Sequence, residues 1–461
     1  VILWATQSVS MIGSALTFFS ITILLTQSLY PAPEQKTQLA FALSAISLGF
    51  GLPNIIFAPI AGAWADRYDR KTIMIWMDYL GAILSQVLLV MLLTGTLHLW
   101  LLILVVVLFS ITGAFHGAAF DTSYAMLVSE KQLPRANGMM QTIWSLSGIL
   151  SPAIAAALIA LPNLARQGSI PGSIGLALSG MANGVPIAIA LDVFTFFLAA
   201  VIPLFLFIPS PQHQKQEKPQ SMWADIREGA TFIWQRRPII WLLTSFTVAN
   251  LFLAFAIIQR PLMVKFNLAP DWSANGFTFE TAFALLSSVG GIGGIASGFL
   301  ISTWGGLRTR RVFGVLVPMI ITGFAQIIYG FSPWLTLTAA ATALWSAMIP
   351  ILNAHSQAIW QSVTPRELQG RVFSVRRVIA QFTIPLGTLL GGSAGGFFDP
   401  GIAMAVGGTL MVIFTITQLF NPALLRIEDK EYMARVIAAA SSKMGTQPIK
   451  ARPNPSQKTG V

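Results

Sequence analysis

The chain has 461 residues, of which 54% are hydrophobic and only 10% are charged. Soluble domains carry roughly 25% charged residues, so this composition argues against a soluble enzyme or a DNA-binding protein, despite a net charge of +11. The chain contains no cysteine, which excludes disulfides, thiol catalysis and cysteine metal sites. Its four histidines lie too far apart in the sequence to predict a zinc site.

Apolar runs recur along almost the whole chain. A membrane helix needs about 20 mostly apolar residues, and we predict an all-α, polytopic membrane protein with about 12 such spans. The predicted spans are 1–27, 38–64, 73–95, 99–127, 138–162, 186–208, 239–266, 278–303, 312–331, 334–360, 372–397 and 401–424. The first span starts without Met or a basic flank, so we expect residues to precede Val1. We expect no cleaved signal peptide, because the apolar run is too long and lacks a small-residue cleavage site.

The basic residues sort to one side of these spans. The loops after spans 2, 4, 6, 8 and 10 and the tail after span 12 hold every Lys and Arg except Lys36, Arg166, Arg260 and Lys265. Cytoplasmic loops are enriched in Lys and Arg, so the pattern predicts a multi-pass protein of the cell membrane with both termini cytoplasmic. This orientation accounts for the positive net charge without nucleic acid.

The longest basic loop, 209–238, divides the chain into two bundles of six helices, 1–208 and 239–424. A cytoplasmic tail, 425–461, follows and is predicted to be partly disordered. Within the loop, apolar residues recur at helical spacing, which favours an amphipathic helix on the inner membrane face over a plain linker. These residues are Trp223, Ile226, Ala230, Ile233 and Trp234.

The two halves repeat each other's signals. Gly62–Lys71 follows span 2 and Gly305–Arg311 follows span 8, while Leu133–Gly138 enters span 5 and Thr364–Gly370 enters span 11. Glycine and charge thus recur at equivalent places. A duplication of six spans predicts two pseudo-symmetric bundles with a binding site between them near the bilayer midplane.

The segment 62–71 resembles the signature that joins spans 2 and 3 in the major facilitator superfamily. The matching residues are Gly62, Asp66, Arg67, Arg70 and Lys71. The order of features along the chain resembles the efflux branch of macrolide and siderophore exporters. The supporting segments are Leu133–Gly138, Asp225–Gly229, Gly370–Arg377 and Ile384–Gly387.

This resemblance implies an inner gate. Asp66 would pair with a cation and with the positive N-terminus of span 11, entered near Val372, and so hold the inner side shut. Gly62 would let the spans pack closely at their inner ends. An ordinary positive-inside loop is the alternative, and it would explain the basic residues but not Gly62 and Asp66 together.

Span 5 contains a second motif, Gly148–Ala156, which resembles the Gly/Pro helix-packing motif of antiporters. Gly148 and Pro152 are retained, whereas Ser151 and Ala155 stand where the motif has glycines. Such antiporters often carry an Arg within span 4, and span 4 here has none. The motif therefore favours export only weakly over an ordinary proline-containing membrane helix.

Ionisable residues within the predicted spans are candidates for proton coupling or for lining the substrate cavity. Asp192, well inside span 6, is the clearest proton-carrier candidate, and a hydrogen bond to a neighbouring helix is its alternative role. Asp78 is predicted to join the inner salt-bridge cluster. The other candidates are His116, Asp121, Arg260 and the polar residues Asn353 and His355. The expected partner of Asp121 is Lys131 or Arg135, and for Arg260 the alternatives are a contact with Asp192 and an outward orientation.

No nucleotide site is predicted. Gly291–Ala296 matches a dinucleotide fingerprint by letter, but it lies inside an apolar span with no preceding strand, so a helix-packing face is favoured. The chain also has no Walker lysine motif. We predict no cofactor, no metal and no enzymatic activity.

The predicted function is secondary active transport by alternating access, as proton-coupled efflux of a hydrophobic or amphiphilic, drug-like or macrolide-like molecule. The expected partners are the lipid bilayer, the small-molecule substrate and protons, and a monomer is expected. The alternatives are a transporter of a siderophore, lipid or nutrient with the same fold, or a membrane receptor that does not transport.

Overall fold

The computed structural model describes residues 2–127, 133–206, 222–365 and 368–444, and these residues are all helical or in short connections. Within them, 12 helical segments are long and apolar enough to cross a membrane. They are Ile2–Leu29, Pro33–Ala65, Arg70–Leu93, Leu99–Asp121, Ser145–Arg166, Val185–Phe205, Arg237–Phe266, Phe279–Trp304, Phe313–Phe331, Leu335–Val363, Gln369–Phe397 and Pro400–Leu419. The predicted all-helical fold with its twelve spans is confirmed.

The helices form an N-terminal and a C-terminal half. The N half holds α1 (Ile2–Leu24), α2 (Lys36–Arg67), α3 (Arg70–Leu93), α4 (Leu99–Leu127), α5 (Leu133–Arg166), α6 (Gly172–Ser179) and α7 (Val185–Val201), with short turns at Leu25–Leu29, Pro33–Gln35 and Ile202–Phe205. The linker helix α8 (Met222–Trp234) leads to the C half. That half holds α9 (Arg237–Phe266), α10 (Ala269–Ala274), α11 (Phe279–Trp304), α12 (Phe313–Phe331), α13 (Leu335–Val363), α14 (Gln369–Gln381), α15 (Ile384–Phe397), α16 (Pro400–Leu419), α17 (Pro422–Leu425) and α18 (Lys430–Met444).

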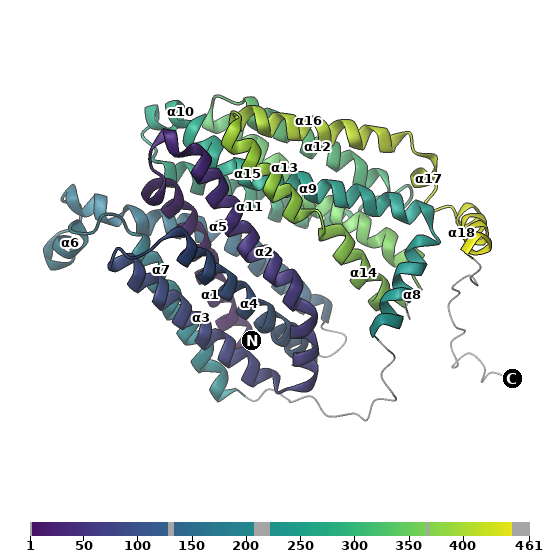
Figure 1. Ribbon diagram of the computed structural model, residues 1–461, viewed down its shortest axis with the longest axis horizontal. Helices are drawn as coiled ribbons and strands as arrows, with labels where there is room; N and C mark the ends of the chain where they lie inside the picture. Colours follow the sequence, from purple (N-terminus) through teal and green to yellow (C-terminus); the bar gives the residue numbers. More distant parts are fainter. Residues whose placement is uncertain (1, 128–132, 207–221, 366–367, 445–461) are drawn as a thin grey trace.

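The two halves lie side by side and diverge toward one end (Figure 1). We call the end where α1 begins and α2 ends the termini end, and the opposite end the far end. The described hydrogen bonds between the halves lie in the middle or at the far end. For example, Ser44 of α2 donates to the Thr388 carbonyl at 3.0 Å, and Ser288 of α11 donates to the Ile149 carbonyl at 2.9 Å. The halves are therefore closed at the far end in this arrangement.

Glycines bring helices of the C half into close contact. A Cβ added to Gly293 of α11 would lie 2.5 Å from the Ala343 carbonyl oxygen of α13, and one added to Gly291 would lie 2.4 Å from Ile149 of the N half. Small residues at such crossings allow backbones to approach. The helix-packing interpretation of Gly291–Ala296 is therefore consistent with the contacts, and the glycines join α11 to helices of both halves.

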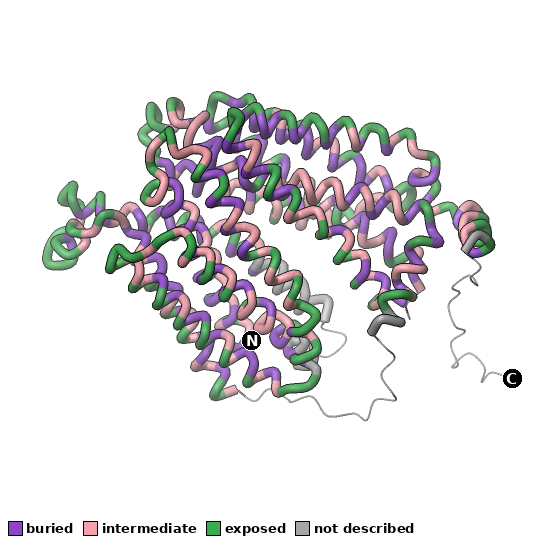
Figure 2. Tube along the Cα trace, in the orientation of Figure 1, coloured by how far each residue is buried: buried purple, intermediate pink, exposed green. Residues whose placement is uncertain are grey.

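The outward faces of the helices are exposed and apolar. Figure 2 shows buried residues where helices meet and exposed residues along their outer surfaces. Large apolar side chains such as Phe299, Ile413 and Phe420 are more than half exposed. A soluble protein rarely exposes so much apolar surface, whereas lipid chains cover such faces in a bilayer.

The helix predicted within the linker is present as α8. It packs on the start of α14, where a Cβ on Gly229 would lie 2.6 Å from the Arg371 carbonyl oxygen, and where Arg371 pairs with Glu228. Phe232 and Ile233 are fully buried and Trp234 is 58% exposed. The helix thus has one face on the C half and one free face, while the side chain of Trp223 lies outside the described part of the chain.

Candidate functional site

Asp192 lies inside the N half, as its position in the sequence predicts. Its carboxylate is fully buried and accepts hydrogen bonds from Thr17 of α1 at 2.7 Å, Ser85 of α3 at 2.9 Å and Thr195 of α7 at 3.4 Å. Gly13 leaves room for this cluster, because a Cβ there would lie 2.7 Å from Asp192 Oδ1. The carboxylate therefore joins three helices through neutral donors.

A second polar cluster lies closer to the termini end. His116 Nε2 of α4 is 3.3 Å from Asp78 Oδ1 of α3, and Gln7 of α1 donates to Asp78 Oδ2 at 3.1 Å. Asp78 is buried, whereas the His116 side chain is 20% exposed. The sequence singled out both residues but did not pair them, because residues from different helices cannot be aligned without the packing.

Asp121 lies one helical turn nearer the termini end than His116, and its side chain is exposed. Its charge is attracted by His116 and, across the halves, by Arg377 of α14. Lys131 lies outside the described residues and so does the side chain of Arg135. Arg377, a residue of the other half, is thus one of two groups that attract the charge of Asp121, and sequence spacing did not predict it.

In the segment between α2 and α3, two basic side chains donate hydrogen bonds to backbone carbonyls. Arg70 Nε donates to the Ala65 carbonyl at 2.9 Å, and Lys71 Nζ donates to the Leu206 carbonyl at 2.8 Å, which fixes α3 to the end of the sixth span. Asp69 caps α3 by accepting from the Thr72 amide at 3.0 Å. Arg67 ends α2 with an exposed side chain.

The predicted inner gate depends on Asp66, Gly62 and the start of span 11. The side chain of Asp66 lies outside the described part of the chain, and an added Cβ on Gly62 would meet no atom within 4 Å. Val372, near the expected partner position, is fully buried in the core of the C half. Gly62 thus makes no close helix contact among the described residues, and the inner gate stays a prediction.

The Gly148–Ala156 motif lies at the contact between the halves. Ser151 donates to the Ile12 carbonyl at 2.9 Å within the N half, and Ile149 contacts Gly291 of α11. Gly148 itself has space for a Cβ, and Pro152 lies inside α5. The motif thus lies at the α5–α11 crossing, where the close contact is between Ile149 and Gly291 and does not involve a Cβ position at Gly148.

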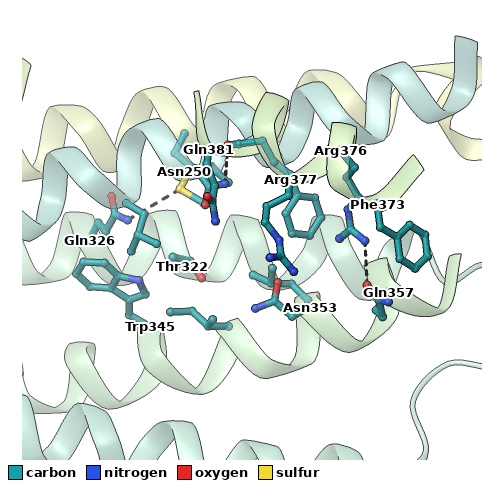
Figure 3. A pocket seen from close by; sticks show the side chains of 17 residues that line it. Asn250, Thr322, Gln326, Trp345, Asn353, Gln357, Phe373, Arg376, Arg377 and Gln381 are labelled. Atoms are coloured by element: carbon teal, nitrogen blue, oxygen red, sulfur yellow. Dashed lines mark hydrogen bonds between the residues drawn. The ribbon is translucent and has the colours of Figure 1, made fainter. Parts of the chain in front are cut away.

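A cavity of about 410 Å³ lies within the C half, between α9, α12, α13, α14 and α16 (Figure 3). Its wall toward the termini end is polar and cationic, formed by Asn353, Gln357, Arg376 and Arg377. Arg376 donates to Gln357 Oε1 at 2.9 Å and to Ser356 Oγ at 3.2 Å. Among the residues that the structure describes, no Asp or Glu lines this cavity.

The other end of the cavity is buried and holds Thr322, Gln326 and Trp345. Figure 3 shows these side chains on one side of the cavity and the two arginines on the other. Between them, Asn250 of α9 donates to the Ala380 carbonyl at 2.8 Å, next to the break between α14 and α15. The broken eleventh span therefore exposes backbone to α9, which a continuous helix would not do.

Arg260 and His355 are placed differently from what the sequence suggested. Arg260 does not meet Asp192, since its guanidinium lies over the Trp345 ring at 6.0 Å within the C half. His355 is buried and structural: its Nε2 accepts from the Leu307 amide at 2.8 Å, and its Nδ1 is 2.7 Å from the Ile351 carbonyl oxygen. Of the two polar residues predicted on α13, Asn353 lines the cavity and His355 does not.

The sequence missed most residues of this cavity. Arg376 and Arg377 fall inside the predicted span 372–397, but their charges were counted with the loop. An ionisable residue within a span is a functional candidate by default, and that signal would have found both. Thr322, Gln326 and Trp345 give no such signal, because isolated polar residues are common in membrane helices.

Membrane-spanning helices in two halves, joined by a helical linker and holding a polar cavity, define a multi-pass membrane transporter. The model of the Major Facilitator Superfamily matches residues 3–388. The chain belongs to that superfamily, which is a family of transporters and not of enzymes.

The relatives whose names state a function have low sequence identity to this chain. The chain is 27% identical over 390 residues to the macrolide efflux protein A of Streptococcus pyogenes, covering 84% of this chain and 87% of that protein. It is 22% identical to a putative bacilysin exporter of Bacillus subtilis, covering 82% and 85%. Among solved structures, an inward-facing, occupied bacterial homologue of the lysosomal transporter Spinster has a TM-score of 0.59 at 17% identity and covers 98% of both chains. The POT family transporter PepTSo has a TM-score of 0.64 at 12% identity, and the match covers 93% of this chain and 99% of that chain.

Proposed function

We propose that this protein exports an amphiphilic small molecule across the bacterial cell membrane in exchange for protons, by alternating access. Two of its relatives are named as a macrolide efflux protein and as a putative bacilysin exporter. Both termini are proposed to be cytoplasmic, because the basic loops collect at the termini end. The termini end is then the cytoplasmic side.

One observation carries the proposal. The two halves are hydrogen bonded at the far end and diverge toward the termini end. Alternating access requires two such states that differ by rotation of the halves. With a cytoplasmic termini end, this arrangement is the inward-open state in which an exporter loads its substrate.

The proton pathway is proposed to run through the N half. Asp192 is the proposed carrier, because it is a buried carboxylate without a cationic partner among the described residues around it. The His116–Asp78 pair is a second candidate, since His116 is partly exposed and can exchange a proton with water from the termini end. Separate substitutions in the two clusters distinguish these roles.

The test of transport uses full-length protein in proteoliposomes loaded with a macrolide. Imposing a pH gradient of either sign should change the direction and rate of macrolide movement, and collapsing the gradient should stop net accumulation. Transport that continues unchanged after every ion gradient is collapsed would contradict proton coupling. A panel of candidate substrates, compared in expressing and non-expressing cells, then distinguishes export of drugs from uptake and from transport of a lipid, siderophore or nutrient. If no compound is transported, the receptor alternative is favoured.

The orientation is tested with introduced cysteines, since residues 1–461 contain no cysteine that would react in the background. Arg237→Cys and Arg310→Cys at the termini end should react with an impermeant reagent only from the cytoplasmic side. Asn275→Cys in the far-end connection should react only from outside. Labelling of all three from the same side would overturn the proposed topology.

A further inference from the structure

The C-half cavity contains buried polar atoms that lack partners. Trp345 Nε1, Gln326 Oε1 and Thr322 Oγ1 are buried without a hydrogen bond, and all three residues line the cavity. Buried polar groups are nearly always paired, and an unmade hydrogen bond costs the desolvation of the group. An indole donor, an amide acceptor and a hydroxyl thus remain unpaired in side chains at the buried end of the cavity, where a ligand that can hydrogen bond would find partners.

The opposite wall carries positive charge without a balancing acid in the cavity lining. Arg377 is exposed, makes no hydrogen bond within the described residues, and is attracted by Asp121 of the other half. Arg376 is fixed by Gln357 and stacks over Trp360 at 5.0 Å. A guanidinium binds carboxylates and phosphates with paired N–H donors, so two adjacent arginines in an apolar span favour a ligand with anionic oxygens.

We propose that this cavity binds the transported molecule, and that the substrate class is an amphiphile with an anionic carboxylate or phosphate headgroup. The headgroup lies against Arg377 and Arg376. An apolar body contacts Leu253, Ile349 and Met411, and a carbonyl or hydroxyl on it meets Trp345 and Gln326. A volume of about 410 Å³ falls in the range of sites for drug-sized ligands. The proposal rests on the transport function proposed above.

Direct binding tests the headgroup. Full-length protein in phosphatidylcholine nanodiscs is titrated with 11-(dansylamino)undecanoic acid, with the phosphate on the same tail and with the neutral methyl ester of the acid. The two anionic probes should bind at least about tenfold tighter than the ester, a difference of about 1.4 kcal/mol. Adding phosphatidylglycerol to the nanodiscs distinguishes the sources: competition assigns the site to a lipid headgroup, and unchanged binding assigns it to a free amphiphile.

Variants test the residues. Arg377→Gln should weaken the anionic probes about tenfold and leave the ester unchanged, whereas Asp121→Asn should strengthen the anionic probes about threefold, because it removes the competing carboxylate. Arg308→Gln, which removes an exposed charge from the α11–α12 connection, is the matched control and should change nothing. Melting temperatures check that each variant is folded.

The outcomes are separable from those of the transport test. Equal binding of acid and ester, or anionic binding that is indifferent to both Arg377→Gln and Asp121→Asn, overturns the headgroup assignment even if macrolide export is driven by a pH gradient. Charge-selective binding that follows the variants, without transport of the macrolide or of any probe, supports the site and overturns the transport proposal instead.

Discussion

Lys265 of α9 donates a hydrogen bond to the Tyr30 carbonyl of the N half at 2.6 Å, and it also donates to the Thr26 carbonyl. On α2, Lys36 makes the corresponding contact in the other direction, to the Phe398 carbonyl at 3.0 Å. Each half thus reaches the other with one lysine at the far end. Lys36 and Lys265 are two of the four Lys and Arg residues that lie outside the predicted cytoplasmic loops and tail.

Removing Lys265 should favour opening of the far end. A hydrogen bond to a charged group contributes about 1.5–3 kcal/mol, so Lys265→Ala should move a large share of molecules out of the present arrangement. Distances between spin labels on the far-end connections of the two halves should lengthen. Lys430→Ala, on the exposed part of α18, is the control, and equal distance distributions in the two variants would contradict the closing role of Lys265.

Asp192→Asn should uncouple transport while preserving the fold. The amide keeps an oxygen that can accept from Thr17 and Ser85, so the melting temperature should fall only slightly, but the side chain can no longer carry a proton. We expect pH-driven transport to drop at least about tenfold, equivalent to about 1.4 kcal/mol. Asp429→Asn at the start of α18 is the control, and full pH-driven transport by Asp192→Asn at normal expression would refute the proton-carrier assignment.

Gly13→Ala should disturb the same cluster without changing any titratable group. Its Cβ would lie 2.1 Å from Thr195 Oγ1 and 2.7 Å from Asp192 Oδ1, so side chains must shift. Overpacking of this kind costs about 1–3 kcal/mol, and the melting temperature should fall accordingly. Gly51→Ala on α2, where an added Cβ meets no atom within 4 Å, should leave the melting temperature unchanged.

His116 and Asp78 should act as one unit. If their contact at 3.3 Å is functional, His116→Gln and Asp78→Asn should each reduce pH-driven transport, and the double variant should be little worse than the more damaging single variant. Non-additivity of about 0.5–3 kcal/mol is usual for residues in contact. Strictly additive losses in the double-mutant cycle would show that the two residues contribute separately.

Gly62→Leu tests the inner gate. The position has open space in the present arrangement, so the variant should fold and melt normally. If the gate closes by close packing at Gly62, the added side chain should block closure of the termini end and abolish transport while the far end remains closed. Normal transport by Gly62→Leu would mean that this glycine is not part of the gate.

The sequence by itself determined the membrane spans and the family. Their apolar length follows from bilayer thickness, and alternate basic loops follow from membrane orientation, so both are local properties of the chain. The depth of Asp192 could be predicted for the same reason. The superfamily signature around Asp66 and Arg70 was recognised by comparing amino-acid sequences alone.

Tertiary structure alone decided which residues meet. The pairing of His116 with Asp78, the attraction between Asp121 and Arg377, and the structural role of His355 each depend on how separate helices rotate and cross. The helical spacing of residues shows which side chains share a face of a helix. It does not show which other helix packs against that face. The cavity with Trp345, Gln326 and Arg377 arises from five helices of the C half, so its chemistry became visible only when those helices were packed together.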